Sequence, residues 1–187
     1  MQLASWAVLV GVAAKAYIAR VKAVSKPSDH PEFFRFPAPE GRSRESTIRL
    51  DGEGVFHHDE ALVEHPKLRD ALHTWIARHP DDGRYILTNG YDWTYFVVDD
   101  VPFFVRSVRE DDGDAILVLS DATEEPLDPA TLHPNERGEL YLQVKRDAKG
   151  GPFDAKLTRF AQTQLGPFLE NDGDAVLVKT KRGAKRL

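Results

Sequence analysis

The sequence predicts an α+β fold with mostly antiparallel β-sheet and two amphipathic helices. Three observations support this prediction: strand-like runs outnumber helical ones, most connections between them resemble hairpin turns, and the composition is that of a globular protein. The chain has 187 residues, of which 41% are hydrophobic and 29% charged, which suits one domain or two small ones sharing a surface. Wholly disordered, collagen-like and polytopic membrane proteins are therefore excluded.

Local patterns place the elements in order. Short β-type runs at residues 47–50 and 55–57 flank an Asp-Gly-Glu-Gly turn and predict a hairpin. Apolar residues spaced at i, i+3, i+4, i+7 and i+8 from Leu68 to Ile76 predict a helix that begins at Pro66 and ends at His79. A second helix carries Leu157, Phe160, Ala161 and Leu165. Further strands are expected at residues 84–88, 93–98, 102–108, 115–119, 140–145 and 175–179.

The charge balance and the absence of cysteine exclude several functional classes. Lys and Arg number 25 against 30 Asp and Glu, which gives a net charge of −5 and no global attraction to nucleic acid or anionic membranes. Cysteine is absent, so disulfides, thiolate zinc sites, iron–sulfur clusters and a cysteine nucleophile are excluded. We therefore expect no nucleic-acid partner.

Residues 1–26 form a separate apolar and basic segment. Residues 3–19 are mostly apolar and are interrupted by the charge of Lys15, and three basic residues follow between positions 20 and 26. The uninterrupted run is shorter than the roughly 20 residues of a spanning helix, and no basic residue precedes it as in a secretory signal. We expect a non-spanning segment or a start-site extension and a cytoplasmic protein, with tethering or export by residues 3–19 as open alternatives. Membrane contact is expected only through this segment.

The rest of the chain divides into a linker, two halves and a tail. Residues 27–46 are rich in Pro, Arg and Ser and contain three phenylalanines, which indicates a linker that packs on the domain. Residues 47–122 are assigned to a first α+β half and residues 123–180 to a second. Residues 181–187 form a basic tail, expected to be solvated and frayed.

Two internal similarities predict that these halves are related. A helix followed by an Asp-Gly turn and an apolar strand occurs at residues 67–87 and again at residues 156–178. In addition, ENDGDAVLV at residues 170–178 nearly copies EDDGDAILV at residues 110–118. Asp-Gly before an apolar strand also recurs by chance as good turn chemistry, but the shared context favours two similar small halves packed together.

The densest polar cluster is His57-His58-Asp59-Glu60. Imidazole and carboxylate groups can hold a metal ion, but adjacent strand residues point to opposite faces, and no HExxH pattern or second ligand pair is present. We therefore expect a polar turn, with no metal, cofactor or catalytic residue assigned. A hydrolase or metal-assisted enzyme that uses His57, His58 and Asp59 is the competing interpretation.

Residues 88–104 are the most informative stretch. A strand ends in Thr-Asn-Gly, and an aromatic strand then continues into Val-Asp-Asp-Val-Pro-Phe-Phe. Pro102 has no amide donor and marks a strand start or edge, while Asp99 or Asp100 can accept backbone amide hydrogens. The pattern predicts a rigid corner, and a polar lip beside an aromatic wall also has the general form of a small-ligand site.

A series of short segments occurs in a characteristic order along the chain: FRFPAPEG, IRLDGEGVFHH, DDGRYILT, VDDVPF, LYLQVKR and LTR. In this order of segments the chain resembles the bacterial family known as domain of unknown function 1285. The resemblance covers roughly residues 34–169, and VDDVPF after DGRYILT is its specific part. The chain departs from the family at Phe56, where Trp is usual, at Asn89-Gly90, which replaces a Thr-Pro turn, and in its apolar leader.

The resemblance implies a compact α+β protein built from two similar halves, with a role in ligand-linked signalling. By analogy, the ligand-binding positions are Thr88, Asp100, Pro102, Lys145 and Arg159.

We interpret the protein as a non-enzymatic module that binds a small anionic ligand or a protein partner. Asp100, Lys145 and Arg159 would orient the ligand, and a bidentate Arg159 favours a carboxylate or phosphate. A structural protein that docks near a membrane through its N-terminal segment is the third interpretation. The expected walls of the site are Tyr95, Phe103, Phe104 and Tyr141.

Overall fold

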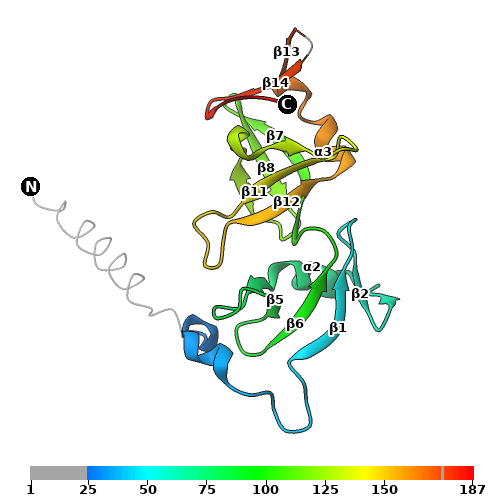
Figure 1. Ribbon diagram of the computed structural model, residues 1–187, viewed down its shortest axis with the longest axis vertical. Coiled ribbons are helices and arrows are strands. Elements are labelled where there is room, and N and C mark those ends of the chain that lie inside the picture. Colours follow the sequence, from blue (N-terminus) through cyan, green and yellow to red (C-terminus); the bar gives the residue numbers. More distant parts are fainter. Residues whose placement is uncertain (1–24, 174) are drawn as a thin grey trace, which may run out of the picture.

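The computed structural model describes residues 25–173 and 175–187 and has the predicted α+β fold. Two six-stranded sheets lie one after the other along the long axis of the molecule, and a three-stranded sheet follows at the C-terminal end (Figure 1). The predicted apolar segment lies outside the described residues except for its last two positions. In the described part of the chain, no helix is long and apolar enough to cross a membrane.

The first half contains one sheet and one α-helix. Helix α2 (Pro66–Thr74) lies between the third and fourth strands, and the 3-10 helices η1 (Pro27–Asp29) and η2 (Pro31–Arg35) precede the sheet. The strands are β1 (Glu45–Leu50), β2 (Phe56–His58), β3 (Ala61–Leu62), β4 (Ile76–Arg78), β5 (Tyr85–Thr88) and β6 (Trp93–Val98).

The second half repeats this plan and continues into the third sheet. Helix η3 (Pro129–Thr131) lies between its third and fourth strands, and α3 (Arg159–Thr163) and η4 (Gly166–Phe168) follow its sixth. Its strands are β7 (Phe103–Asp111), β8 (Asp114–Leu119), β9 (Glu124–Pro126), β10 (His133–Pro134), β11 (Leu140–Val144) and β12 (Phe153–Leu157). The third sheet consists of β13 (Leu169–Asp172), β14 (Ala175–Thr180) and β15 (Gly183–Arg186).

The two six-stranded sheets have the same topology. Their strand orders are β3-β2-β1-β6-β5-β4 and β9-β8-β7-β12-β11-β10. In each sheet the first and sixth strands pair in parallel at the centre, and the other pairs are antiparallel. The prediction of two similar halves in a mostly antiparallel fold is therefore confirmed. The sheets divide at residues 99–102, and the division predicted after residue 122 lies inside the second sheet, because β8 turns there into β9.

The helix-turn-strand similarity found in the sequence pairs elements that are not equivalent. α2 lies between the third and fourth strands of its half, whereas α3 follows the sixth strand. The element of the second half that corresponds to α2 is the short helix η3. The halves are therefore related by strand order and not by the repeat that the sequence displays.

Both helices are shorter than predicted. α2 ends at Thr74 and not at His79, because the residues that follow form β4 and pair with β5. α3 begins at Arg159, so that Leu157 lies in β12, and Phe160 is 62% exposed and is not part of an apolar face. Apolar residues in short strands next to a helix satisfy a helical spacing by position alone, so the spacing extended both helices too far.

The C-terminal residues are not the frayed tail that the sequence predicted. Strand β15 pairs with β14 through four residues on each side. Lys181 Nζ lies 2.7 Å from Asp112 Oδ2 in the turn between β7 and β8, and Arg186 Nε lies 3.4 Å from Asp172 Oδ2 in β13. The basic charges of this end are thus paired with acidic turns of the neighbouring strands.

The segment before β1 packs on the first sheet. Phe34 is buried against Ile86 of β5 and Trp93 of β6, and its carbonyl oxygen lies 3.2 Å from His79 Nε2. Ile86 and Leu87 point to opposite faces of the sheet. The segment therefore covers one face of the first sheet, while Leu87 on the other face belongs to the main core, which also includes Leu72 of α2.

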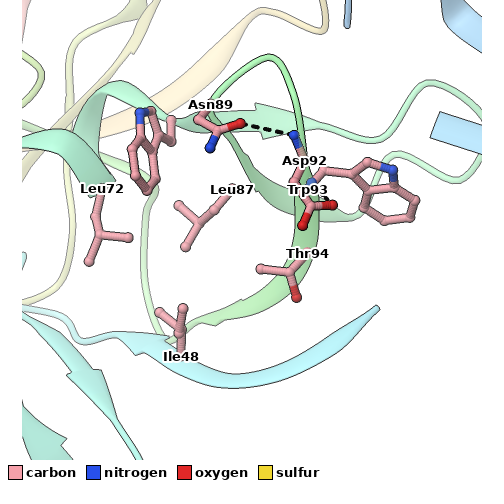
Figure 2. A pocket seen from close by; sticks show the side chains of 8 residues that line it. Ile48, Leu72, Leu87, Asn89, Asp92, Trp93 and Thr94 are labelled. Carbon is pink, nitrogen blue, oxygen red and sulfur yellow. Dashed lines mark hydrogen bonds between the residues drawn. The ribbon is translucent and has the colours of Figure 1, made fainter. Parts of the chain in front are cut away.

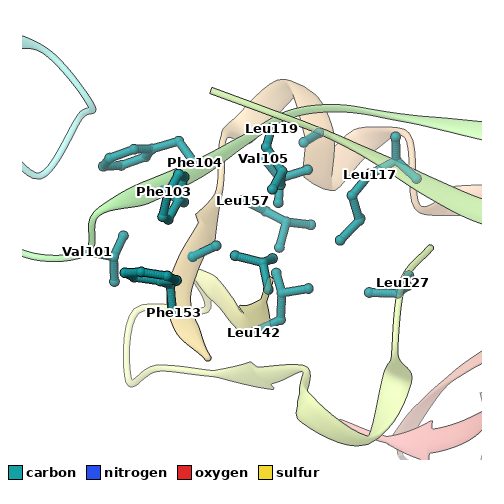
Figure 3. Close-up of a cluster of buried hydrophobic side chains, with 14 of the residues drawn as sticks. Val101, Phe103, Phe104, Val105, Leu117, Leu119, Leu127, Leu142, Phe153 and Leu157 are labelled. Carbon is teal, nitrogen blue, oxygen red and sulfur yellow. The ribbon is translucent and has the colours of Figure 1, made fainter. Parts of the chain in front are cut away.

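Buried apolar side chains from both halves form one continuous core. In the second half, strand β8 shows a strict alternation in which every second side chain is fully or almost fully buried. Such alternation is what a strand needs when one of its faces is covered. Figure 3 shows the part of this core built from Val101, Phe103, Phe104, Val105, Leu117, Leu119, Leu127, Leu142, Phe153 and Leu157.

The turn between β1 and β2 anchors the first half on the second. Asp51 Oδ1 accepts hydrogen bonds from the amides of Glu53 and Val55, at 3.0 and 2.9 Å, and so fixes the turn. Gly54 follows with φ of +81°, and a Cβ atom added there would lie 2.9 Å from Phe104 Cδ2 in β7. Gly54 is therefore required both by the turn and by the approach of the two halves.

Replacing Gly54 by alanine tests this approach. We expect a loss of about 2–4 kcal/mol in the free energy of unfolding, since a left-handed alanine costs about 1 kcal/mol or more and the contact with Phe104 adds overpacking. Urea denaturation measures the loss. The matched control is Gly41→Ala, where φ is +73° but nothing lies within 4 Å of the added Cβ. Equal losses in the two variants would show that the contact with Phe104 contributes nothing.

Candidate functional site

The Val-Asp-Asp-Val-Pro corner is the joint between the two halves. The amide of Asp99 donates to the carbonyl of Leu50 at 3.0 Å, and Asp99 Oδ2 accepts from Arg49 Nη1 at 2.6 Å, both in the first half. Val101 and Pro102 are buried. Pro102, one of the predicted ligand positions, therefore lies in the buried interior of the corner.

Asp100 makes the opposite connection, to the second half. Its Oδ2 accepts a hydrogen bond of 3.0 Å from the hydroxyl of Tyr141 and lies 3.5 Å from Lys156 Nζ. Burial raises the pKa of Tyr141, and the hydrogen bond to Asp100 raises it further. Asp99 and Asp100, adjacent in the sequence, thus hold the two halves from opposite sides of the joint.

A polar groove of about 780 Å³ runs past this joint. The β1–β2 turn of the first half forms one wall, and the turn before β11, the end of β12 and α3 form the other. We refer to this site as the polar groove. Its lining residues are Gly52, Glu53, Phe104, Arg137, Gly138, Glu139, Lys156, Leu157, Thr158, Arg159, Phe160 and Gln162.

Lys156 is the cation of the polar groove whose side chain is fixed by ion pairs. Its side chain is only 12% exposed, and Nζ lies 2.8 Å from Glu139 Oε1 and donates to the carbonyl of Gly52 at 3.3 Å. Burial alone lowers the pKa of Lys156, but the hydrogen bond to Glu139 and the nearby acidic groups outweigh it, so that the net pKa is raised. Lys156 is therefore a charged group that ties together both halves and the β11 turn.

Two further cations of the polar groove are free. Within residues 25–173 and 175–187, neither Arg137 nor Arg159 has a side-chain hydrogen bond or an ion pair. Thr158 Oγ1 accepts from the amide of Ala161 at 3.2 Å and starts α3, which places Arg159 at its first position. The charge of Glu139 is balanced by Lys156. The lining then contains two positive guanidinium groups and one negative carboxylate, that of Glu53. The free charge of the lining is positive.

The structure brings together some of the predicted site residues and separates others. Arg159 lines the polar groove, and Asp100 contacts its lysine. Thr88 lies at the end of β5, where its hydroxyl donates to the carbonyl of Asp92 at 2.9 Å within a turn of the first half. Among the predicted walls, Phe104 lines the polar groove and Tyr141 binds Asp100, whereas Phe103 is packed in the core and Tyr95 bonds to Asp82 in the first half.

Lys145 forms a partly buried ion pair with Asp121. Its Nζ lies 2.7 Å from Asp121 Oδ2 and donates to Thr123 Oγ1 at 2.9 Å, with the Lys145 and Asp121 side chains 17% and 9% exposed. Burial alone raises the pKa of Asp121, but hydrogen bonds from Lys145 and Thr123 outweigh it and the net pKa is lowered. The amide of Lys145 also donates to both carboxylate oxygens of Glu125. The geometry gives Lys145 a structural contact and no place in the polar groove.

Arg137 and Lys156 are lining residues that the sequence reasoning missed. Lys156 was assigned to a helix, whereas in β12 it alternates with the buried Ala155 and Leu157 and points to the other face. The signal was the alternation Phe-Asp-Ala-Lys-Leu, which indicates a strand. Arg137 lies in a turn, and no sequence pattern around it apart from its own charge indicates a binding residue.

The side chains of the histidine cluster contact nearby residues of the first half. His57 Nε2 lies 2.8 Å from Asp51 Oδ2 and braces the β1–β2 turn. His58 lies 3.8 Å from Asp59, and Asp59 Oδ1 accepts from Thr47 Oγ1 at 2.6 Å. In the part of the chain that the structure describes, no group of three or more His, Asp or Glu side chains is placed to hold a metal ion.

The aromatic stretch of the first half borders a second, smaller cavity of about 160 Å³. Asn89 and Asp92 form a polar lip beside Trp93 and Thr94, as Figure 2 shows. Asn89 Oδ1 accepts from the amide of Asp92 at 2.9 Å, and Asp92 Oδ1 binds Arg44 at 2.6 Å. The lip is therefore held by the turn, and the remaining wall is apolar: Ile48, Leu72, Trp75 and Leu87.

Comparison with known proteins identifies the fold. No protein-family model matches the sequence, and no curated protein matches it. The crystal structure of a DUF1285 family protein from Silicibacter pomeroyi DSS-3 aligns with a TM-score of 0.59 and 14% identity, over 82% of this chain and 91% of that chain. The crystal structure of a DUF1285 family protein from Shewanella baltica OS155 aligns with a TM-score of 0.48 and 15% identity, over 63% and 87%. The first likeness confirms a DUF1285-like fold, as the sequence resemblance predicted.

Proposed function

We propose that the protein is a binding module for a small carboxylate or phosphate, which it takes up in the polar groove. The observation that carries the proposal is the pair of guanidinium groups, Arg137 and Arg159, that reach this groove from two different elements without a partner among the described residues. Guanidinium groups bind planar or tetrahedral anions through paired hydrogen bonds. The volume of about 780 Å³ lies within the range of roughly 300–1,000 Å³ that is usual for ligand sites.

The other lining residues supply shape and orientation. Phe104 and the exposed ring of Phe160 offer apolar surface, and Lys156 adds a positive charge that Glu139 holds in place. Asp100 is not a lining residue, but it contacts Lys156 and acts as a positioning residue for that lysine. This proposal therefore retains Asp100 and Arg159 of the predicted site and replaces Lys145 by Lys156.

The position of the polar groove supports a signalling role within this proposal. Gly52 and Glu53 belong to the first half, and the other lining residues belong to the second. A ligand that contacts both halves stabilises the joint between them, so that a partner that recognises the joint would respond to the ligand.

A thermal-shift experiment on the full chain tests the proposal with inorganic phosphate and citrate as probes. A ligand at 100 times its dissociation constant adds about 2.7 kcal/mol, which raises the melting temperature by roughly 5–10 °C for a chain of this size. We expect one of the probes to raise it and Arg159→Gln to abolish the rise. The matched control is Arg69→Gln, an exposed helical arginine away from the polar groove. Equal shifts in both variants, or no shift with either probe, would contradict the proposal.

A further inference from the structure

A long apolar groove follows α2 in the first half. The cavity at Trp93 shares three lining residues, Ile48, Leu72 and Trp75, with a neighbouring cavity of about 500 Å³. The two cavities therefore lie next to each other along α2, and we call them together the α2 groove. The larger cavity adds His58, Ala61, Leu62, Val63, Glu64, His65 and Leu68.

The α2 groove exposes apolar side chains that the fold leaves uncovered. Leu62 on the edge strand β3 is 49% exposed, and Leu68 on α2 is 42% exposed. The two-residue strand β3 ends the sheet, so that no further strand covers this side in the described part of the chain. An apolar depression with a few polar groups on its rim is the form of surface that accepts the apolar side chains of another segment.

The described chain begins at one end of this groove. The amide of Ser28 donates to the carbonyl of Gly90 at 3.2 Å, and the Lys26 side chain packs on Gly90. Gly90 is adjacent in sequence to Asn89, which lines the Trp93 end of the α2 groove. Lys26 therefore lies near the Trp93 end of the α2 groove, the end opposite Leu62.

We propose that the α2 groove is the docking site for residues 3–19 of the same chain. These residues are mostly apolar, and Lys15 is their only charged residue. The five residues 20–24 can span about 17 Å when extended, and α2, with nine residues, is only about 13.5 Å long. The segment is thus long enough to cover the groove from the Gly90 end to β3.

Tethering favours this occupant over a second copy of the chain. A segment joined through a short linker is present at the groove at an effective concentration in the millimolar range, far above that of another chain in dilute solution. Charge is also compatible, because Glu64 lines the groove without an ion-pair partner among the described residues, and Lys15 is the single charge of the segment. A lysine in an apolar segment can lay its stem on apolar surface while its ammonium group reaches an acidic rim.

Disulfide cross-linking in the full chain tests the proposal, because the sequence contains no cysteine. Leu68→Cys places one thiol in the α2 groove, and a second thiol is introduced in turn at Leu9, Val10, Val12 and Ala13. The matched control is Val176→Cys in the third sheet, which is 37% exposed against 42% for Leu68. We expect intramolecular disulfides to form at least about tenfold faster with Leu68→Cys than with Val176→Cys for one or more of the four positions. Leu62→Cys, at the other side of the groove, is the second variant and should behave like Leu68→Cys.

The alternatives give different products. Cross-links between two chains, at a rate that rises with protein concentration, would overturn the proposal in favour of a second copy. Equal rates for Leu68→Cys and Val176→Cys, with the chain recovered on phosphatidylcholine vesicles, would overturn it in favour of a membrane surface. Equal rates without vesicle binding would show that the segment does not occupy the groove.

Discussion

Replacing Lys145 by methionine is expected to lower the free energy of unfolding by about 2–4 kcal/mol, between the values for an exposed and a fully buried ion pair. The substitution removes the ammonium group that lies 2.7 Å from Asp121 Oδ2, in a pair whose side chains are 17% and 9% exposed. Asp121 would then be a largely buried carboxylate without a counter-ion, since its remaining side-chain partner is the hydroxyl of Thr123. Urea denaturation at pH 7 measures the loss.

An exposed ion pair provides the matched control. Lys179 Nζ lies 3.1 Å from Glu170 Oε1, but the two side chains are 59% and 55% exposed. Lys179→Met should therefore cost no more than about 1 kcal/mol. The double variant Lys145→Met, Asp121→Asn should recover part of the lost free energy of unfolding, because it no longer contains an unpaired carboxylate at position 121. A small loss in the single variant would contradict a structural ion pair.

The double variant also separates the two roles considered for Lys145. The sequence resemblance makes it a ligand residue, whereas the structure pairs it with Asp121. If the ligand lies in the polar groove, the stabilised double variant should respond to phosphate or citrate as the native chain does. A lost response in a folded double variant would place the ligand at Lys145.

The strands were predictable where they are long runs of apolar and β-branched residues. β6, β8 and β14 are such runs, bounded by turn residues, and were placed within one residue of their ends. β3 and β10 contain only two residues each, and no local pattern can mark so short a strand. The parallel pairs β1–β6 and β7–β12 join segments distant in the sequence, so their pairing follows from the packed fold and not from local patterns.

The site was predictable only in part, for the same reason. Asp100 and Arg159 were found because they belong to motifs that resemble a family. Arg137 reaches the polar groove from a turn near β11, and Lys156 from a strand that had been read as a helix. A groove made by the meeting of two halves has no contiguous signature, because each half supplies a few residues that are ordinary in their own context.

Lowering the pH from 7.5 to 5 is expected to destabilise the protein by about 2 kcal/mol through a single histidine, His73. His73 lies in α2, is 4% exposed and packs edge-on against the ring of Phe56 at 4.9 Å between centroids. Burial, with the nearby charge of Arg106, lowers its pKa from 6.5 to about 4. Between these two values the unfolded chain binds a proton that the folded chain excludes, so stability falls as the pH falls.

This pH window distinguishes His73 from the acidic groups. Asp51 and Asp121 have lowered pKa values in the folded protein, so their stabilisation is lost only below the pKa of an ordinary aspartate, near 3.8. His73→Leu removes the titratable imidazole and places an apolar side chain of similar size beside Phe56. The free energy of unfolding of this variant should change little between pH 7.5 and 5. His30→Gln, at an exposed position, is the control and should leave the slope unchanged. A slope that survives in His73→Leu would contradict the prediction, because other titratable groups would then set the pH dependence between pH 7.5 and 5.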